Sequence, residues 1–161
     1  MSQADPPPTP EPTGRARVYV RHSGAHGAGH VGWGYAVPSG NWAVGAVEKG
    51  GIITPPVNDG FWREEIIDPN PRMRDLVYNA YKEFEVTAPN PTAARQQEDA
   101  IDKRSFSIAR HNCMNDTYDV LTAYGAPLPD PDRIWDWRPN DWFREVVGDL
   151  ITLTAPGAAS A

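Results

Sequence analysis

Two apolar segments on either side of a short turn predict a β-hairpin, which is the strongest constraint that the sequence places on the fold. The segments VGWGYAV (31–37) and WAVGAVE (42–48) flank PSGN, whose Ser-Gly centre favours a tight turn. Glycines inside both segments indicate that another backbone or an aromatic ring packs closely against them. The chain therefore builds at least part of its fold on antiparallel strands.

Further strands are predicted on both sides of this hairpin, and helices come after them. RVYVR (17–21) alternates polar and apolar residues, and FWREEII (61–67) is typical of another strand. The predicted helices are a stripe from Met73 to Phe84 after Asn70–Pro71, a polar segment from Asn90–Pro91 through TAARQQEDAI, a segment from Cys113 ended by Gly125, and NDWFREVV (140–147). Early strands, later helices and no repeat predict an α+β fold, with a small antiparallel sheet packed against helices.

The chain of 161 residues suits a single domain with short tails. The N-terminal segment ADPPPTPEPTG holds five prolines and no large apolar residue, so residues 1–14 are expected to form a disordered, proline-rich leader. Residues 155–161 have nothing to bury and are expected to be a disordered tail. The folded domain should then span 15–154, with six tryptophans, six tyrosines and four phenylalanines to fill its core.

Charge and composition argue against several classes of function. The chain has 15 basic and 21 acidic residues, a net charge of −6 and no lysine/arginine cluster longer than two, so nucleic acid is not an expected partner. The first residues lack the pattern of a signal peptide, and no apolar run approaches membrane-spanning length. One cysteine excludes an internal disulfide and suits a reducing compartment. We expect cytoplasmic synthesis without stable membrane insertion; export would need a dedicated secretion machine.

The single cysteine, Cys113, lies in RHNCMNDTYDVL (110–121), where Asn112 is a good helix N-cap. Three interpretations are open for it: a buried small hydrophobe, a metal ligand or an activated nucleophile. In the third, a helix N-terminus aims partial positive charge and unpaired N–H groups at the sulfur, which favours the thiolate and would stabilise an oxyanion. Such a nucleophile also needs a histidine base and a group that orients the base.

Four histidines are available as the base. His30 opens the strand HVGWGYAV and would project from a sheet edge, whereas His22 and His26 lie among glycines and His111 suits a capping role at the helix start. The spacing of the first three histidines is that of zinc ligands on one helix face. However, the intervening glycines argue against a helix, and no second cysteine completes a ligand set. We therefore expect neither a metal nor another cofactor.

The pairing of GHVGWGYAV (29–37) with HNCMNDTYDVLTAYG (111–125) resembles the circularly permuted papain-like hydrolases. These are relatives of the NlpC-type cell-wall peptidases and of the lecithin:retinol acyltransferase group, in which histidine precedes cysteine in the chain. The resemblance covers about Arg17 to Gly125.

The resemblance implies Cys113 as nucleophile, His30 as base and a third polar residue on the strand after the histidine. Glu48 is our choice for the third residue. A two-residue turn at the Ser-Gly centre would pair His30 with Lys49. Glu48 would then point to the opposite face of the sheet, unless a β-bulge turned it.

This interpretation predicts a cysteine hydrolase, an amidase or thiol peptidase, that forms an acyl-Cys113 intermediate. The resemblance implies peptidoglycan peptides or lipid acyl groups as substrates, and it leaves thiol acyltransferase or lipid esterase activity open. Asn112 would position the oxyanion donors, and Trp33, His111 and Trp135 are candidates for the wall of a substrate cleft. An exported antibacterial effector would also have an immunity or carrier protein as partner. The rival interpretation is a non-catalytic binding module on the same scaffold.

Overall fold

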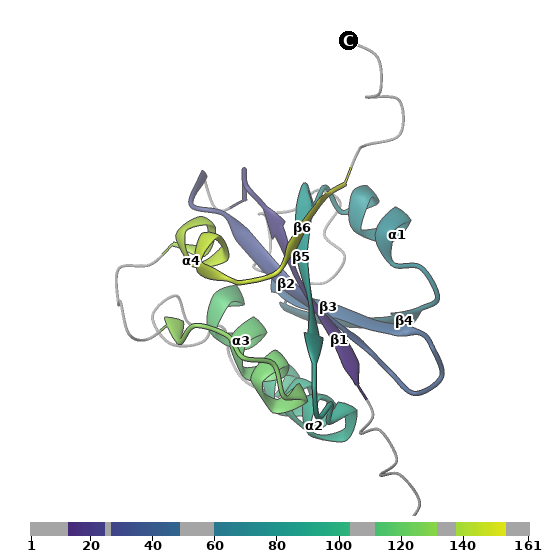
Figure 1. The fold of residues 1–161 in the computed structure, drawn as a ribbon. Helices are drawn as coiled ribbons and strands as arrows, with labels where there is room; N and C mark the ends of the chain where they lie inside the picture. The colour runs from purple at the N-terminus through teal and green to yellow at the C-terminus, as the bar shows by residue number, and fades with distance from the viewer. Residues whose placement is uncertain (1–12, 25–26, 49–59, 104–111, 132–137, 154–161) are drawn as a thin grey trace, which may run out of the picture.

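The computed structural model describes residues 13–24, 27–48, 60–103, 112–131 and 138–153. Its centre is a six-stranded antiparallel sheet with the spatial order β4-β3-β2-β1-β5-β6. The strands are β1 (Gly14–Arg21), β2 (His30–Ala36), β3 (Trp42–Glu48), β4 (Gly60–Ile66), β5 (Ala80–Val86) and β6 (Asp149–Thr152). The helices of the described ranges are α1 (Asn70–Asp75), α2 (Pro91–Asp102), α3 (Cys113–Tyr124) and α4 (Pro139–Glu145). The predicted α+β class is confirmed (Figure 1).

Helices cover both faces of the sheet, but unequally. Figure 1 shows α2, α3 and α4 on one face of the sheet and α1 on the other. The larger apolar core joins β1 and β2 to α2, α3 and α4, and a smaller cluster joins Tyr19 and Trp62 of the sheet to Met73 of α1. Because both faces are covered, β2 is buried along almost its whole length. No helix of the described ranges is long and apolar enough to cross a membrane.

The predicted hairpin forms, and its glycines have the predicted purpose. A Cβ atom at Gly45 would lie 2.7 Å from the Trp33 ring and 2.6 Å from the carbonyl oxygen of Trp62. These distances are shorter than van der Waals contact, so a side chain at this position would push the ring and the neighbouring strand away. Glycine therefore allows β2, β3 and β4 to pair beneath a large aromatic side chain.

The register of the hairpin differs by one residue from the predicted one. Val37 N–H donates to the Asn41 carbonyl over 3.0 Å, and Gly40 has a φ of +89°, so the loop has three residues rather than two. The resulting pairs run from Ala36↔Trp42 to Trp33↔Gly45. Continued by three residues, this register places Glu48 opposite His30 and on the same face. The predicted pairing of His30 with Lys49 was wrong, and no bulge is needed.

The helix predicted from Met73 to Phe84 was also wrong. α1 ends at Asp75, Val77 has a φ of +59°, and the chain continues as β5. β5 pairs with β1 on one side and with β6 on the other, so its backbone groups are satisfied by the sheet. β6 was not predicted, because four residues carry too little pattern to be recognised.

The predicted helices α2 and α3 are confirmed, together with their caps. Asn90 caps α2 by accepting the Ala93 N–H over 2.9 Å, and Gly125 ends α3 with a φ of +114°. In both cases the signal is local, so it does not depend on the rest of the fold. The helix predicted at 140–147 also forms, but α4 runs from Pro139 to Glu145, because the backbone is already extended at Val146, and it has no side-chain cap.

Candidate active site

Cys113 is the first residue of α3, and Asn112 caps this helix. The Asn112 side-chain oxygen accepts the N–H groups of Met114, over 2.9 Å, and Asn115, over 3.0 Å. The cap does not use the N–H of Cys113 itself. The predicted role of this part of the helix start in stabilising an oxyanion stays a prediction.

His30 is the first residue of β2, and the loop before it is anchored to α4. Gly29 N–H donates to the Gly24 carbonyl over 2.9 Å, and Asn140 N–H donates to the Ala28 carbonyl over 3.1 Å. Gly29 has a φ of +99°, and a Cβ atom there would lie 2.4 Å from Asn140 Oδ1. The start of β2 is thus held at a close approach that only glycine allows, and the His30 side chain is only 6 % exposed.

Glu48 closes the other end of the site at the end of β3. Its Oε1 atom lies 3.6 Å from His30 Nε2 and 3.7 Å from Arg21 Nη2, and the residue is 2 % exposed. Because Nε2 faces Glu48, Nδ1 is the ring nitrogen available to Cys113. The three residues proposed from the sequence therefore come together from β2, β3 and α3.

The electrostatics of His30 reflect both neighbours. Burial opposes protonation of the ring. However, the negative charge of Cys113 and the hydrogen bond with it, followed by the interaction with Glu48, outweigh burial and raise the pKa of His30 to about 9. With this pKa the His30 ring carries a positive charge at neutral pH, next to the side chains of Cys113 and Glu48.

We predict that this coupling is visible in a titration. His30 should titrate near pH 9 in the wild-type protein and at a lower pH in Cys113→Ala, because the substitution removes the anion that favours the charged ring. Ring resonances in NMR spectra recorded across the pH range would measure both midpoints. Equal His30 midpoints in the two proteins would contradict the coupling.

Two further residues of the site were missed in the sequence. Arg21, at the end of β1, is 3 % exposed and donates from Nε and Nη2 to the Leu76 carbonyl over 3.2 and 2.7 Å. Its guanidinium lies 4.7 Å from the centre of the Tyr78 ring. Burial, and then the charge of Glu48, raise the pKa of Tyr78 well above its ordinary value. No local pattern marks these residues, because their partners are distant in sequence.

One proposed cleft residue belongs to the core. Trp33 is fully buried, its Nε1 donates to Glu98 Oε1 over 3.2 Å, and its ring stacks on Phe61 with centroids 6.1 Å apart. The prediction that Trp33 lines a cleft was wrong, because its strand is covered on both faces. His111 and Trp135 lie outside the described residues.

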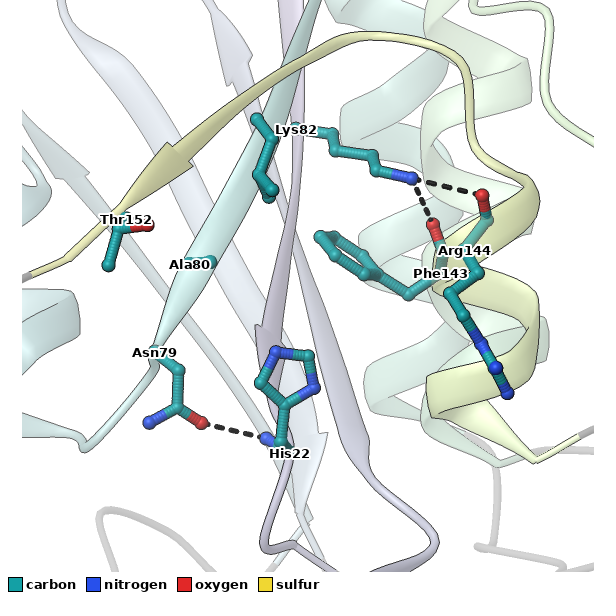
Figure 2. Close-up of a pocket in the computed structure, with 8 residues that line it drawn as sticks. His22, Asn79, Ala80, Lys82, Phe143, Arg144 and Thr152 are labelled. Atoms are coloured by element: carbon teal, nitrogen blue, oxygen red, sulfur yellow. Dashed lines mark hydrogen bonds between the residues drawn. The ribbon is translucent and has the colours of Figure 1, made fainter.

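A separate pocket of about 360 Å³ lies between β5, β6 and α4 (Figure 2). His22 lines it: its backbone N–H donates to Asn79 Oδ1 over 2.8 Å, and its ring meets the Phe143 ring edge-on. Lys82 Nζ donates to the Phe143 and Arg144 carbonyls over 2.8 and 3.1 Å at the end of α4. The residues of this pocket do not include His30, Glu48 or Cys113.

The two described histidines have different surroundings. His22 Nδ1 lies 3.1 Å from Asn140 Oδ1, whereas His30 faces Glu48 and Cys113. His26, the middle member of the histidine series, lies outside the described ranges. Within those ranges, no group of three or more histidine, cysteine, aspartate or glutamate side chains is arranged to hold a metal ion.

Comparison with models of protein families, with curated proteins and with solved structures finds no match to the chain.

Proposed function

We propose that the protein is a cysteine hydrolase in which Cys113 attacks a carbonyl carbon and His30 transfers the proton. The observation that carries the proposal is the placement of a buried imidazole between Cys113 and the carboxylate of Glu48. A nucleophile, a base and a group that orients the base are the parts that covalent acyl transfer requires.

The proposed reaction has two stages. In the first, the Cys113 thiolate adds to the carbonyl of an amide, ester or thioester, and the oxyanion forms near the Cys113 N–H. His30 then gives its proton to the leaving amine, alcohol or thiol, and the carbon–heteroatom bond breaks to leave acyl-Cys113. In the second, His30 takes a proton from water, the hydroxide adds to the acyl carbon, and the thiolate leaves.

The order of these residues in the chain supports the more specific part of the proposal. His30 opens a strand and precedes Cys113, which opens a helix packed on the same sheet; this is the arrangement expected of a circularly permuted papain-like hydrolase. We extend the proposal to an amidase or peptidase acting on bacterial cell-wall peptides. The same chemistry would serve a thiol acyltransferase or lipid esterase, in which a second nucleophile or a lipid ester takes part.

A small activated ester tests the proposal. Cys113 is 7 % exposed, so p-nitrophenyl acetate is a suitable acyl donor. Intact-mass spectrometry after brief exposure should show one acetyl group on the wild-type protein, located on Cys113 by peptide mapping, and none on Cys113→Ala. Cys113→Ser is the matched control, because it keeps the size of the side chain while weakening the nucleophile, and it should be acetylated far more slowly.

The opposite result would replace the proposal. Cys113 would not be a nucleophile if Cys113→Ala were acetylated at the wild-type rate. The same conclusion would follow if p-nitrophenyl acetate modified the wild-type cysteine only after denaturation. A non-catalytic binding module would then be the better interpretation of the scaffold.

A further inference from the structure

We propose that Arg21 is a positioning residue of this site: it shares one carboxylate oxygen of Glu48 with His30 and supplies a fixed positive charge beside that oxygen throughout the reaction. This inference rests on the proposed function and concerns the same site.

The first support is the way in which the guanidinium is held. Arg21 Nε and Nη2 both donate to the carbonyl of Leu76, the C-cap residue that follows α1. The Arg21 guanidinium also lies over the Tyr78 ring, with its Cζ atom 4.7 Å from the ring centre. The side chain is 4 % exposed, so the cation is fixed by the protein rather than by solvent. A cation that is fixed in this way favours the charged form of a neighbouring carboxylate, even where water does not reach it.

The second support is the position of Glu48. Neither of its carboxylate oxygens accepts a hydrogen bond of normal length from a described residue, and its side chain is 2 % exposed. A carboxylate buried in this way tends to take up a proton unless cations are near it. Two cations approach the same atom, Oε1: His30 Nε2 at 3.6 Å and Arg21 Nη2 at 3.7 Å.

These two cations have different roles, because only one of them changes charge in the proposed reaction. In the proposed mechanism the free enzyme holds an alternating series of charges with no net charge: the Arg21 cation, the Glu48 anion, the His30 cation and the Cys113 anion. When His30 gives its proton to the leaving group, it becomes neutral and Cys113 is acylated. Arg21 then remains as the charged neighbour of Glu48 within this series. The site stays neutral in both states, and Glu48 need not take a proton from His30.

Other groups also act on Glu48. Arg72, which lies on α1, and Tyr78, which follows that helix in the chain, both interact with Glu48 electrostatically. Tyr78 stays neutral, because burial and the charge of Glu48 raise its pKa well above the ordinary value. Arg72 is bound through two nitrogens to Glu64, with contacts of 2.9 to 3.2 Å, and is more exposed than Arg21. Arg21 is therefore the cation that is both buried and directed at Oε1.

A double-mutant cycle with p-nitrophenyl acetate tests this role. Arg21→Met should lower kcat/KM by about tenfold to a hundredfold, the effect of leaving a buried charged group without its partner. Arg21→Lys, which keeps the charge, should recover part of this loss. Glu48→Gln should also lower kcat/KM, and the double variant Arg21→Met/Glu48→Gln should be at least as active as Glu48→Gln. The reason is that an unpaired Arg21 beside His30 is itself harmful.

A purely structural role would give another pattern. If Arg21 only held the Leu76 carbonyl, Arg21→Met would lower kcat/KM by the same factor in the wild-type protein and in Glu48→Gln. Arg21→Lys would then be as impaired as Arg21→Met. Either result would overturn the inference. Thermal melting of each variant separates lost activity from lost folding.

A second measurement needs no substrate, so it separates this inference from the proposed function. Arg21 lowers the pKa of His30, whereas Glu48 raises it. In NMR titrations Arg21→Met should therefore move the His30 midpoint up, Glu48→Gln should move it down, and the double variant should lie between them. If these shifts occur but hydrolysis does not depend on Cys113, the proposed function fails and the coupling of Arg21 stands. If hydrolysis depends on Cys113 and His30 but Arg21→Met changes neither the rate nor the midpoint, the role of Arg21 is refuted.

Discussion

Replacement of His30 by alanine is expected to lower kcat/KM for p-nitrophenyl acetate by roughly 10²–10⁴-fold, the usual contribution of a general acid–base catalyst. The ring lies between Cys113 and Glu48. In the proposed mechanism its loss removes the proton donor to the leaving group, the base that activates water and the cation beside the nucleophile. Initial rates at neutral pH, with the fold verified by circular dichroism, would measure the effect.

His22→Ala is the matched control for this experiment. It changes the same residue type one position after Arg21, but His22 lines the separate pocket together with Phe143 (Figure 2). Its Nδ1 atom lies 3.1 Å from Asn140 Oδ1. We expect it to keep the wild-type rate within a factor of a few. Loss of activity in His22→Ala but not in His30→Ala would show that the base has been assigned to the wrong histidine.

The second large effect concerns stability. Glu98→Ala is expected to lower the free energy of unfolding by about 3–5 kcal/mol, the cost of removing one partner of a buried ion pair. The Glu98 side chain is 0 % exposed on α2, pairs with Arg63 Nε from β4, and accepts the Trp33 Nε1–H over 3.2 Å. Alanine would leave both donors without this acceptor and open a space between α2 and the sheet. Urea denaturation of the wild-type protein and of Glu98→Ala would measure the difference in the free energy of unfolding.

Two further variants test whether burial of the ion pair is the reason for the large loss of stability in Glu98→Ala. Arg72 and Glu64 also pair, but their side chains are 35 % and 36 % exposed, so Glu64→Ala should cost only about 0–1 kcal/mol. Replacing both Arg63 and Glu98 by methionine should recover much of the stability, because neither charge is then left unpaired. A Glu98→Ala protein as stable as Glu64→Ala would show that the Arg63–Glu98 pair does not join α2 to the sheet.

Local signals in the sequence were sufficient to predict several elements of the fold. Asn90 and Asn112 accept N–H groups two or three residues ahead of them, and Gly125 takes the left-handed conformation that ends α3. The β2–β3 hairpin is likewise encoded by two apolar segments and the turn between them. These features depend on residues within a few positions of one another, so their physical cause can be seen without the tertiary structure.

The same reasoning failed where two periodicities coincide. Residues 73–84 have apolar side chains at helical spacing, yet AYKEFEV at 80–86 also fits a strand. β1 and β6 provide hydrogen-bond partners along both edges of this segment, and these decide in favour of the strand. Partners so distant in the chain cannot be inferred from a local pattern.

The candidate site divides in the same way. Local sequence is enough to predict that Cys113 opens a helix with a capping asparagine before it, and that His30 opens a strand. The surroundings of these two residues depend on how distant strands and helices pack. One additional residue in the hairpin loop, allowed by the positive φ of Gly40, changes the register and turns Glu48 to the face of His30. Arg21 reaches Glu48 only because β1 lies beside β2 and its guanidinium is held by the Leu76 carbonyl at the end of α1. Such contacts depend on register and packing between distant segments, since a shift of one residue reverses the face to which every side chain in a strand points.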